Sequence, residues 1–186
     1  MKVLLIDNFD SFTFNLGYLL ESLDAEVKVV RNNNVSKSDL NWCDKIVLSP
    51  GPGIPSDAKG MNEVISLMYS EKPILGVCLG MQALAEFFGD SIYNLNKVFH
   101  GVQKCIHIKD ESNLFKGMGP IQEVALYHSW AVQLKEDSCF LPLAFSEDKV
   151  LMAIKHSDLP LFGIQFHPES ILTRNGREMI ENFLKL

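Results

Sequence analysis

KPILGVCLGMQALAEFF, residues 72–88, places a cysteine between two glycines directly after a short apolar run. The run at 74–77 predicts a buried strand, and apolar residues at helical spacing over 80–88 predict a helix. Cys78 therefore falls where a strand gives way to a helix. Ligands of open α/β sheets bind at this end of a strand, so the position alone makes Cys78 a candidate functional residue.

The spacing of Gly76, Cys78 and Gly80 resembles a nucleophile elbow, in which a strained turn presents the middle side chain and the glycines relieve backbone crowding. The first turn of the helix would favour a thiolate and offer the Leu79 N–H to an oxyanion. A buried cysteine that acts as a small hydrophobe is the alternative. A free thiol is only slightly ionised at neutral pH, so a nucleophilic Cys78 predicts a histidine partner.

The chain offers five histidines as that partner: His100, His107, His128, His156 and His167. Two of them, His107 and His156, lie in or beside β-type runs without a supporting acid and are expected to be structural or exposed, whereas His100 and His128 stay open. His167 is favoured because it ends an apolar run and Pro168 biases its backbone toward an extended conformation. Glu169 would then project to the same side and orient the imidazole. Cys78, His167 and Glu169 together predict a catalytic triad.

The rest of the chain predicts an α/β fold. Strands are expected at 2–6, 27–30 and 45–49, helices at 12–23 and 61–69, β-type runs at 103–108, 122–126, 139–146, 150–155 and 161–166, and a last helix at 177–186. Strands that alternate with helices indicate a mostly parallel central sheet flanked by helices. The later runs indicate an antiparallel β extension in the C-terminal half. We expect a single domain that spans residues 1–186.

Composition excludes several classes of function. The 186 residues are 47% hydrophobic with a formal net charge of −6 and well mixed charges, so neither nucleic acid nor an anionic membrane is an expected partner. The first apolar run ends at Asp7, too early for a signal peptide or a membrane span, and we expect a cytoplasmic protein. Cys43, Cys78, Cys105 and Cys139 form no C-x-x-C pair, so no metal site is predicted and most of these thiols should be reduced and buried.

Five segments together carry a family resemblance: DNFDSFTFN (7–15), SPGPGIP (49–55), GVCLGMQ (76–82), YHSWAV (127–132) and FGIQFHPESILT (162–173). In this order and spacing the chain resembles the class I, triad-type glutamine amidotransferases over essentially its whole length. The first segment resembles the glutaminase components of anthranilate synthase and aminodeoxychorismate synthase. The resemblance implies a flavodoxin-like fold.

The same resemblance implies roles for particular residues. Cys78 would attack the side-chain amide of L-glutamine, His167 would move protons, and Glu169 would orient His167. The N–H groups of Gly53 and Leu79 would hold the oxyanion. Glutamine binding would fall to Gly51, Pro52, Gly53, Leu79, Gln82, Ser129 and Trp130. The resemblance implies no cofactor for this chain, and any Mg²⁺ would belong to a partner synthase.

The implied partner is a chorismate-using synthase subunit that receives the ammonia, and the segment 7–15, with Phe12 and Phe14, is expected to help form the contact. The sequence does not decide whether that partner makes anthranilate or aminodeoxychorismate. Met81, Trp130 and Val102 stand where histidine, leucine and lysine are usual in this branch. Catalysis should survive the change at Met81, whereas Trp130 and Val102 alter a region expected to signal to the partner. A stand-alone cysteine hydrolase acting on glutamine or γ-glutamyl compounds is the alternative, and the intact triad disfavours an inactive regulatory subunit.

Overall fold

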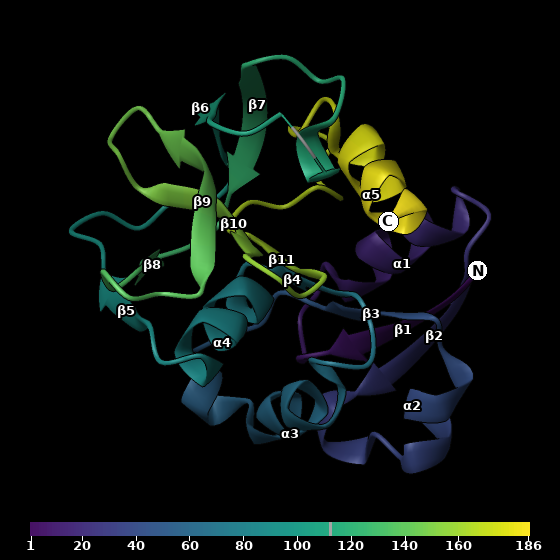
Figure 1. Ribbon diagram of the computed structural model, residues 1–186. Helices are drawn as coiled ribbons and strands as arrows, with labels where there is room; N and C mark the ends of the chain where they lie inside the picture. Colours follow the sequence, from purple (N-terminus) through teal and green to yellow (C-terminus); the bar gives the residue numbers. More distant parts are fainter. Residues whose placement is uncertain (112) are drawn as a thin grey trace.

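The computed structural model describes residues 1–111 and 113–186 and has a mixed β-sheet at its centre (Figure 1). The strands are β1 (Lys2–Asp7), β2 (Glu26–Arg31), β3 (Lys45–Leu48), β4 (Ile74–Val77), β5 (Ser91–Asn94), β6 (Val102–Ile108), β7 (Ile121–Leu126), β8 (Trp130–Gln133), β9 (Phe140–Ser146), β10 (Leu151–His156) and β11 (Leu161–Ile164). Nine of these strands form the central sheet in the order β2-β1-β3-β4-β11-β10-β9-β6-β7. The other two, β5 and β8, pair separately.

The first half of the sheet is parallel, as predicted. The strand order β2-β1-β3-β4-β11 is the doubly wound, flavodoxin-like arrangement, and each neighbouring pair within it runs parallel. From β11 onward the sheet continues through antiparallel pairs. The expected fold class, a mostly parallel α/β sheet with an antiparallel extension, is therefore confirmed.

Helices cover both faces of the parallel strands. The helices are α1 (Thr13–Glu21), α2 (Lys37–Trp42), α3 (Lys59–Met68), α4 (Leu79–Phe87) and α5 (Gly176–Lys185). Figure 1 shows α1 and α5 on one face of the sheet and α2, α3 and α4 on the other. Alternate side chains of β1 accordingly enter two separate hydrophobic clusters, with Val3 and Leu5 in one and Leu4 and Ile6 in the other.

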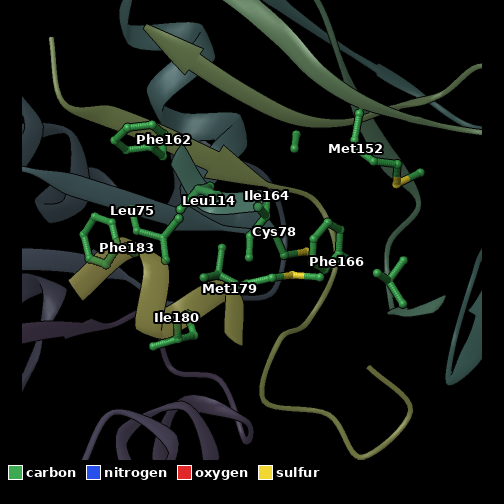
Figure 2. Packing of buried hydrophobic residues seen from close by; sticks show 14 of the residues in the cluster. Leu75, Cys78, Leu114, Met152, Phe162, Ile164, Phe166, Met179, Ile180 and Phe183 are labelled. Carbon is green, nitrogen blue, oxygen red and sulfur yellow. The ribbon is translucent and has the colours of Figure 1, made fainter. Parts of the chain in front are cut away.

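The cluster on the α5 side reaches the predicted nucleophile. Figure 2 shows Cys78 among buried side chains that include Ile164 of β11, Phe166 just after that strand and Met179 of α5. Burial of this apolar surface contributes roughly 25 cal/mol per Å², so the packing fixes the ends of β4 and β11 relative to each other. The elbow at Cys78 is thus built on a rigid part of the molecule.

Among the α-helices and strands, the sequence did not predict α2, β5 and β8. The short helix α2 begins at a capping box, in which the Ser36 side chain accepts a hydrogen bond from the Asp39 N–H and the Asp39 side chain accepts one from the Ser36 N–H. Strands β5 and β8 are four residues each and pair only with one another.

The structure also bears on the expectations about membrane spans and cysteines. Among the described residues, no helix is long and apolar enough to cross a bilayer. The four cysteines are unpaired, Cys43 and Cys78 being buried and Cys105 and Cys139 half-buried.

Candidate active site

Cys78 lies at a sharp turn between β4 and α4. Its backbone has φ 53° and ψ −102°, a conformation that is strained for any residue with a side chain. A Cβ atom on Gly76 would overlap the backbone carbonyl group of Gly80, and one on Gly80 would lie 2.6 Å from the Leu48 carbonyl oxygen. The two glycines therefore permit the close approach of strand and helix that the elbow requires, as the sequence predicted.

His167 and Glu169 form a buried pair. His167 Nδ1 lies 2.7 Å from Glu169 Oε1, and the two side chains are 2% and 0% exposed. The sequence argument for this contact was wrong in one respect, because β11 ends at Ile164 and Glu169 lies in a turn. The Ser170 N–H donates to the His167 carbonyl across that turn. A reverse turn at Pro168, and not an extended chain, brings the carboxylate to the imidazole.

The pKa of His167 is raised to about 10. Burial is the largest single influence and lowers it, but hydrogen bonding and negative charge from Cys78 and Glu169 together outweigh burial. The Cys78 sulfur raises the pKa of His167 first as a hydrogen-bonding neighbour and then as a nearby negative charge, although His167 Nε2 has no hydrogen bond of good geometry. The arrangement favours a charged imidazolium beside the Cys78 sulfur.

A small pocket opens beside Cys78. It has a volume of about 160 Å³ and is lined by Gly51, Pro52, Gly53, Cys78, Leu79, Gln82, Tyr127, His128, Ser129 and Trp130. All seven residues expected to bind glutamine thus lie around one cavity with the sulfur. His167 and Glu169 do not line it. A larger groove of about 620 Å³ lies between β8 and β9, and it contains none of the predicted site residues.

Cys78 also contacts a polar chain that the sequence argument missed. Gln165 is fully buried, and its Nε2 lies 3.4 Å from Cys78 Sγ as a donor. Its Oε1 accepts a hydrogen bond of 3.1 Å from Gln82 Nε2, which also donates to the Trp130 carbonyl. Gln165 lies two positions before His167 in the chain, and that proximity was the only signal for it.

His128 also lines the pocket as a neutral side chain. Its Nδ1 lies 2.8 Å from the Trp130 carbonyl oxygen, which fixes Nδ1 as the donor. Burial lowers the pKa of His128, so the ring stays uncharged and Nε2 keeps a lone pair that has no partner. The Trp130 carbonyl now accepts two hydrogen bonds, from His128 and from Gln82, and both of its lone pairs are used.

Comparison with known proteins agrees with this geometry. The family model described as glutamine amidotransferase class-I matches residues 4–186. The chain belongs to the class-I glutamine amidotransferases. Its relatives include aminodeoxychorismate synthase component 2 of Escherichia coli, 42% identical over 98% of each chain. Anthranilate synthase component 2 of Pseudomonas aeruginosa is 39% identical over 98% of this chain and 94% of its own.

A third relative carries both names. Aminodeoxychorismate/anthranilate synthase component 2 of Bacillus subtilis is 38% identical over 98% of this chain and 95% of its own length. Among solved structures, a Thermoplasma acidophilum protein superposes with a TM-score of 0.90 at 26% identity, covering 100% of this chain and 92% of its own. A glutamine amidotransferase from Thermotoga maritima shares the fold with a TM-score of 0.79 at 15% identity, covering 100% and 96%.

In the segment 7–15, one phenylalanine packs beside the candidate site and another is exposed at the surface. Phe12 is half-buried, with its ring centroid 5.0 Å from that of Tyr127 and 5.5 Å from that of His167. Phe14 is 58% exposed. Of the two phenylalanines expected at a partner contact, Phe14 is free to make one, whereas Phe12 packs against the imidazole.

Proposed function

We propose that this chain is a glutaminase subunit that hydrolyses L-glutamine to glutamate and delivers the ammonia to a chorismate-using synthase subunit. The observation that carries the proposal is the buried pair of His167 and Glu169 beside a cysteine held on a strained elbow at the mouth of a small pocket. The names of the relatives support chorismate chemistry in the partner. We assign the whole chain to one domain and no cofactor to it; any Mg²⁺ would act in the partner.

The first half of the reaction forms a thioester. Cys78 Sγ attacks the side-chain carbonyl carbon of glutamine, and the N–H groups of Gly53 and Leu79 stabilise the oxyanion. The imidazolium of His167 gives its proton to the departing nitrogen, the C–N bond breaks, and ammonia leaves. Glu169 keeps the imidazole oriented and stabilises its charge throughout.

The second half releases glutamate. Water attacks the thioester carbon, and His167 takes a proton from that water. The C–S bond then breaks, which yields the glutamate side-chain carboxyl group and restores the thiolate facing an imidazolium. The pocket residues Gly51, Pro52, Gln82, Ser129 and Trp130 hold the substrate. Because the Trp130 carbonyl is already saturated, Trp130 would contact glutamine through its N–H or its indole ring.

A dedicated glutaminase needs a receiver, since free ammonia is mostly protonated in neutral water. Large apolar side chains are exposed after the carboxyl ends of β1 and β11: Phe9 at 52%, Phe14 at 58% and Ile171 at 96%. Both strands end at the same edge of the parallel sheet as β4, which leads to Cys78. Exposed apolar groups gathered at one edge are typical of a protein interface. The synthase would dock there and receive ammonia across the contact.

The test uses Cys78→Ser in the presence of each candidate partner, anthranilate synthase component I and aminodeoxychorismate synthase component I. The variant should abolish product formation from glutamine and chorismate while the complex stays active with added ammonium chloride. A diazo or chloroketone analogue of glutamine should label Cys78 and spare the other three cysteines, which peptide mass spectrometry would show.

Two outcomes would overturn the proposal. Loss of ammonium-dependent activity in Cys78→Ser would mean that this residue does not act in glutamine hydrolysis alone. High glutamine turnover by the isolated chain, unchanged by either synthase subunit, would indicate a stand-alone hydrolase. The absorption and fluorescence spectra of the aromatic product identify which of the two synthases is served.

A further inference from the structure

The loop 49–53 must be held in place if Gly53 is to offer its N–H to an oxyanion. Gly53 has φ +75°, and the loop pairs with no strand beyond the Ser49 N–H bond to the Ile6 carbonyl. Asn8, at the end of β1, is the side chain that holds the start of this loop. Its Nδ2 donates to the Ser49 carbonyl at 2.8 Å, and its backbone N–H donates to Ser49 Oγ at 2.9 Å.

Asn8 is itself fixed from two further directions. Its Oδ1 accepts a hydrogen bond of 2.9 Å from Asn32 Nδ2, and its Nδ2 also lies 3.2 Å from Met61 Sδ. The residue is 2% exposed. An amide with partners on both its oxygen and its nitrogen has a single orientation, so the position of Asn8 determines where the loop begins.

Close packing couples Asn8 to the rest of the oxyanion site. A Cβ atom on Gly51 would lie 2.8 Å from Asn8 Cβ and 2.6 Å from Leu79 Cδ2. Gly51 is therefore clamped between Asn8 and the residue that follows the nucleophile. A shift of Asn8 would move the loop relative to Leu79, and both N–H donors of the oxyanion depend on that spacing.

The next residue, Phe9, connects this clamp to the surface. Phe9 has φ +60°, a left-handed conformation that is rare for a bulky residue, and its side chain is 52% exposed. The Asp7 carboxylate holds the turn by accepting the Phe9 N–H at 2.9 Å. The exposed ring lies against the Arg31 guanidinium, 5.1 Å from its carbon. Strained backbone of this kind is typical of sites where a contact controls a conformation.

We propose that Asn8 is a positioning residue for the loop 49–53, and that Phe9 is the side chain through which a docked synthase subunit acts on that loop. The inference rests on the glutaminase function proposed above. Docking against Phe9 presses on the peptide it shares with Asn8, and Asn8 passes the displacement to Ser49 and Gly51. Docking at Phe9 would thus adjust the position of the loop relative to Leu79 and raise the rate of glutamine hydrolysis.

The first experiment measures the role of Asn8 in the assembled complex. Asn8→Asp replaces the donor to the Ser49 carbonyl by an oxygen that repels it, and Asn8→Ser shortens the side chain without adding charge. Both variants should lower kcat for glutamine hydrolysis by about 10- to 100-fold, the range expected for a misplaced catalytic donor, while KM changes by less than about threefold. Alkylation of Cys78 by iodoacetamide should keep its rate, because that reaction needs no oxyanion site.

Met61→Leu is the matched control. It removes the second acceptor of the same Asn8 amide, keeps the buried volume, and leaves the bond to Ser49 in place. Its kcat should fall far less than that of either Asn8 variant, because the stronger bonds of Asn8 to Ser49 and Asn32 remain. Circular dichroism shows which variants are folded. If Asn8→Asp does not fold, the kcat of Asn8→Ser alone tests the role of Asn8. A folded Asn8 variant with wild-type kcat would overturn the role of Asn8.

The second experiment tests Phe9 by the ratio of glutaminase rates with saturating synthase and without it. Phe9→Asn removes the ring and suits the positive φ, since asparagine is enriched in that region. The ratio should fall toward 1. Phe14→Asn, at an equally exposed phenylalanine with no link to Asn8, should weaken synthase binding and leave the ratio at saturation unchanged. Equal ratios for Phe9→Asn and the wild type would overturn the role of Phe9.

Different results would contradict the proposed glutaminase function and the proposed roles of Asn8 and Phe9. If the wild-type complex does not hydrolyse glutamine, or does so without Cys78, the proposed function is wrong. If the wild-type complex is active and its rate depends on Cys78, but the Asn8 and Phe9 variants behave as wild type, only the present inference is wrong.

Discussion

Nδ1 of His167 lies 2.7 Å from Oε1 of Glu169 where both side chains are withdrawn from solvent. Glu169 Oε2 has no hydrogen-bond partner among the described residues, so the carboxylate interacts mainly with the imidazole. A buried, partly unsatisfied carboxylate is costly unless a positive charge offsets it. The Glu169 carboxylate is one of the groups that raise the pKa of His167, so removing its charge should lower that pKa.

Glu169→Gln should reduce kcat for glutamine hydrolysis by about 10- to 100-fold, because the amide preserves shape and one hydrogen bond but loses the charge that stabilises the imidazolium. His167→Asn removes the proton carrier itself and should cost about 10³-fold or more. Steady-state assays of glutamate release in the assembled complex compare the two. Equal losses for both substitutions would contradict an orienting role for Glu169.

Stability should fall as pH rises from neutrality through about 10. The pKa of His167 is raised to about 10, above the 6.5 of a free imidazole, so the folded state holds a proton between these values that the unfolded state releases. The stabilisation is complete below pH 6.5 and is lost as pH approaches 10. Urea unfolding at several pH values measures it as the difference in unfolding free energy between wild type and His167→Asn. A pH-independent difference would contradict the raised pKa.

Alanine substitutions at Gly80, in the elbow, and at Gly17, in α1, should have opposite effects on stability. Gly80→Ala would place Cβ 2.6 Å from the Leu48 carbonyl oxygen and should destabilise the fold by about 2 kcal/mol or more. Gly17→Ala, within α1, would place Cβ 3.6 Å from Leu5 Cδ2, an ordinary contact. It should stabilise the protein by about 0.5–1 kcal/mol through better helix propensity. Denaturant midpoints of the two variants measure both changes in stability. If Gly80→Ala were as stable as the wild type, β3 and α4 would not pack as closely as described.

Local sequence patterns sufficed for the parallel half of the fold and for the residues around the pocket. Apolar runs such as 74–77 have turn residues at both ends, and glycine spacing identified the elbow. The short strands β5 and β8 lacked such a pattern, since Ser91–Asn94 is largely exposed and shows no alternation of buried and exposed residues. Their pairing depends on tertiary contacts that no local pattern encodes.

The contacts of three site residues could not be predicted from the sequence. Asn8 and Gln165 stand in the segments 7–15 and 162–173, and His128 stayed open as a partner of Cys78, but no local pattern indicates what these side chains contact. Gln165 lies 87 positions from the cysteine it contacts, and Asn8 lies 41 positions from Ser49. These contacts arise because β1, β3, β4 and β11 end at one edge of the sheet, which places residues distant in sequence around the same thiol.

Gln165 provides a test of that polar chain. Gln165→Leu removes the donor 3.4 Å from Cys78 Sγ and also the acceptor of Gln82 Nε2, while it keeps the buried volume nearly unchanged. A hydrogen bond to a charged group contributes about 1.5–3 kcal/mol, so kcat should fall by roughly 10- to 100-fold if the sulfur is a thiolate in the resting enzyme. Gln165→Glu, which brings a carboxylate to the sulfur, should lower it further. Rates of glutamate release and of Cys78 alkylation by iodoacetamide, measured together, decide the matter: a normal alkylation rate in Gln165→Leu would show that this side chain does not stabilise the thiolate.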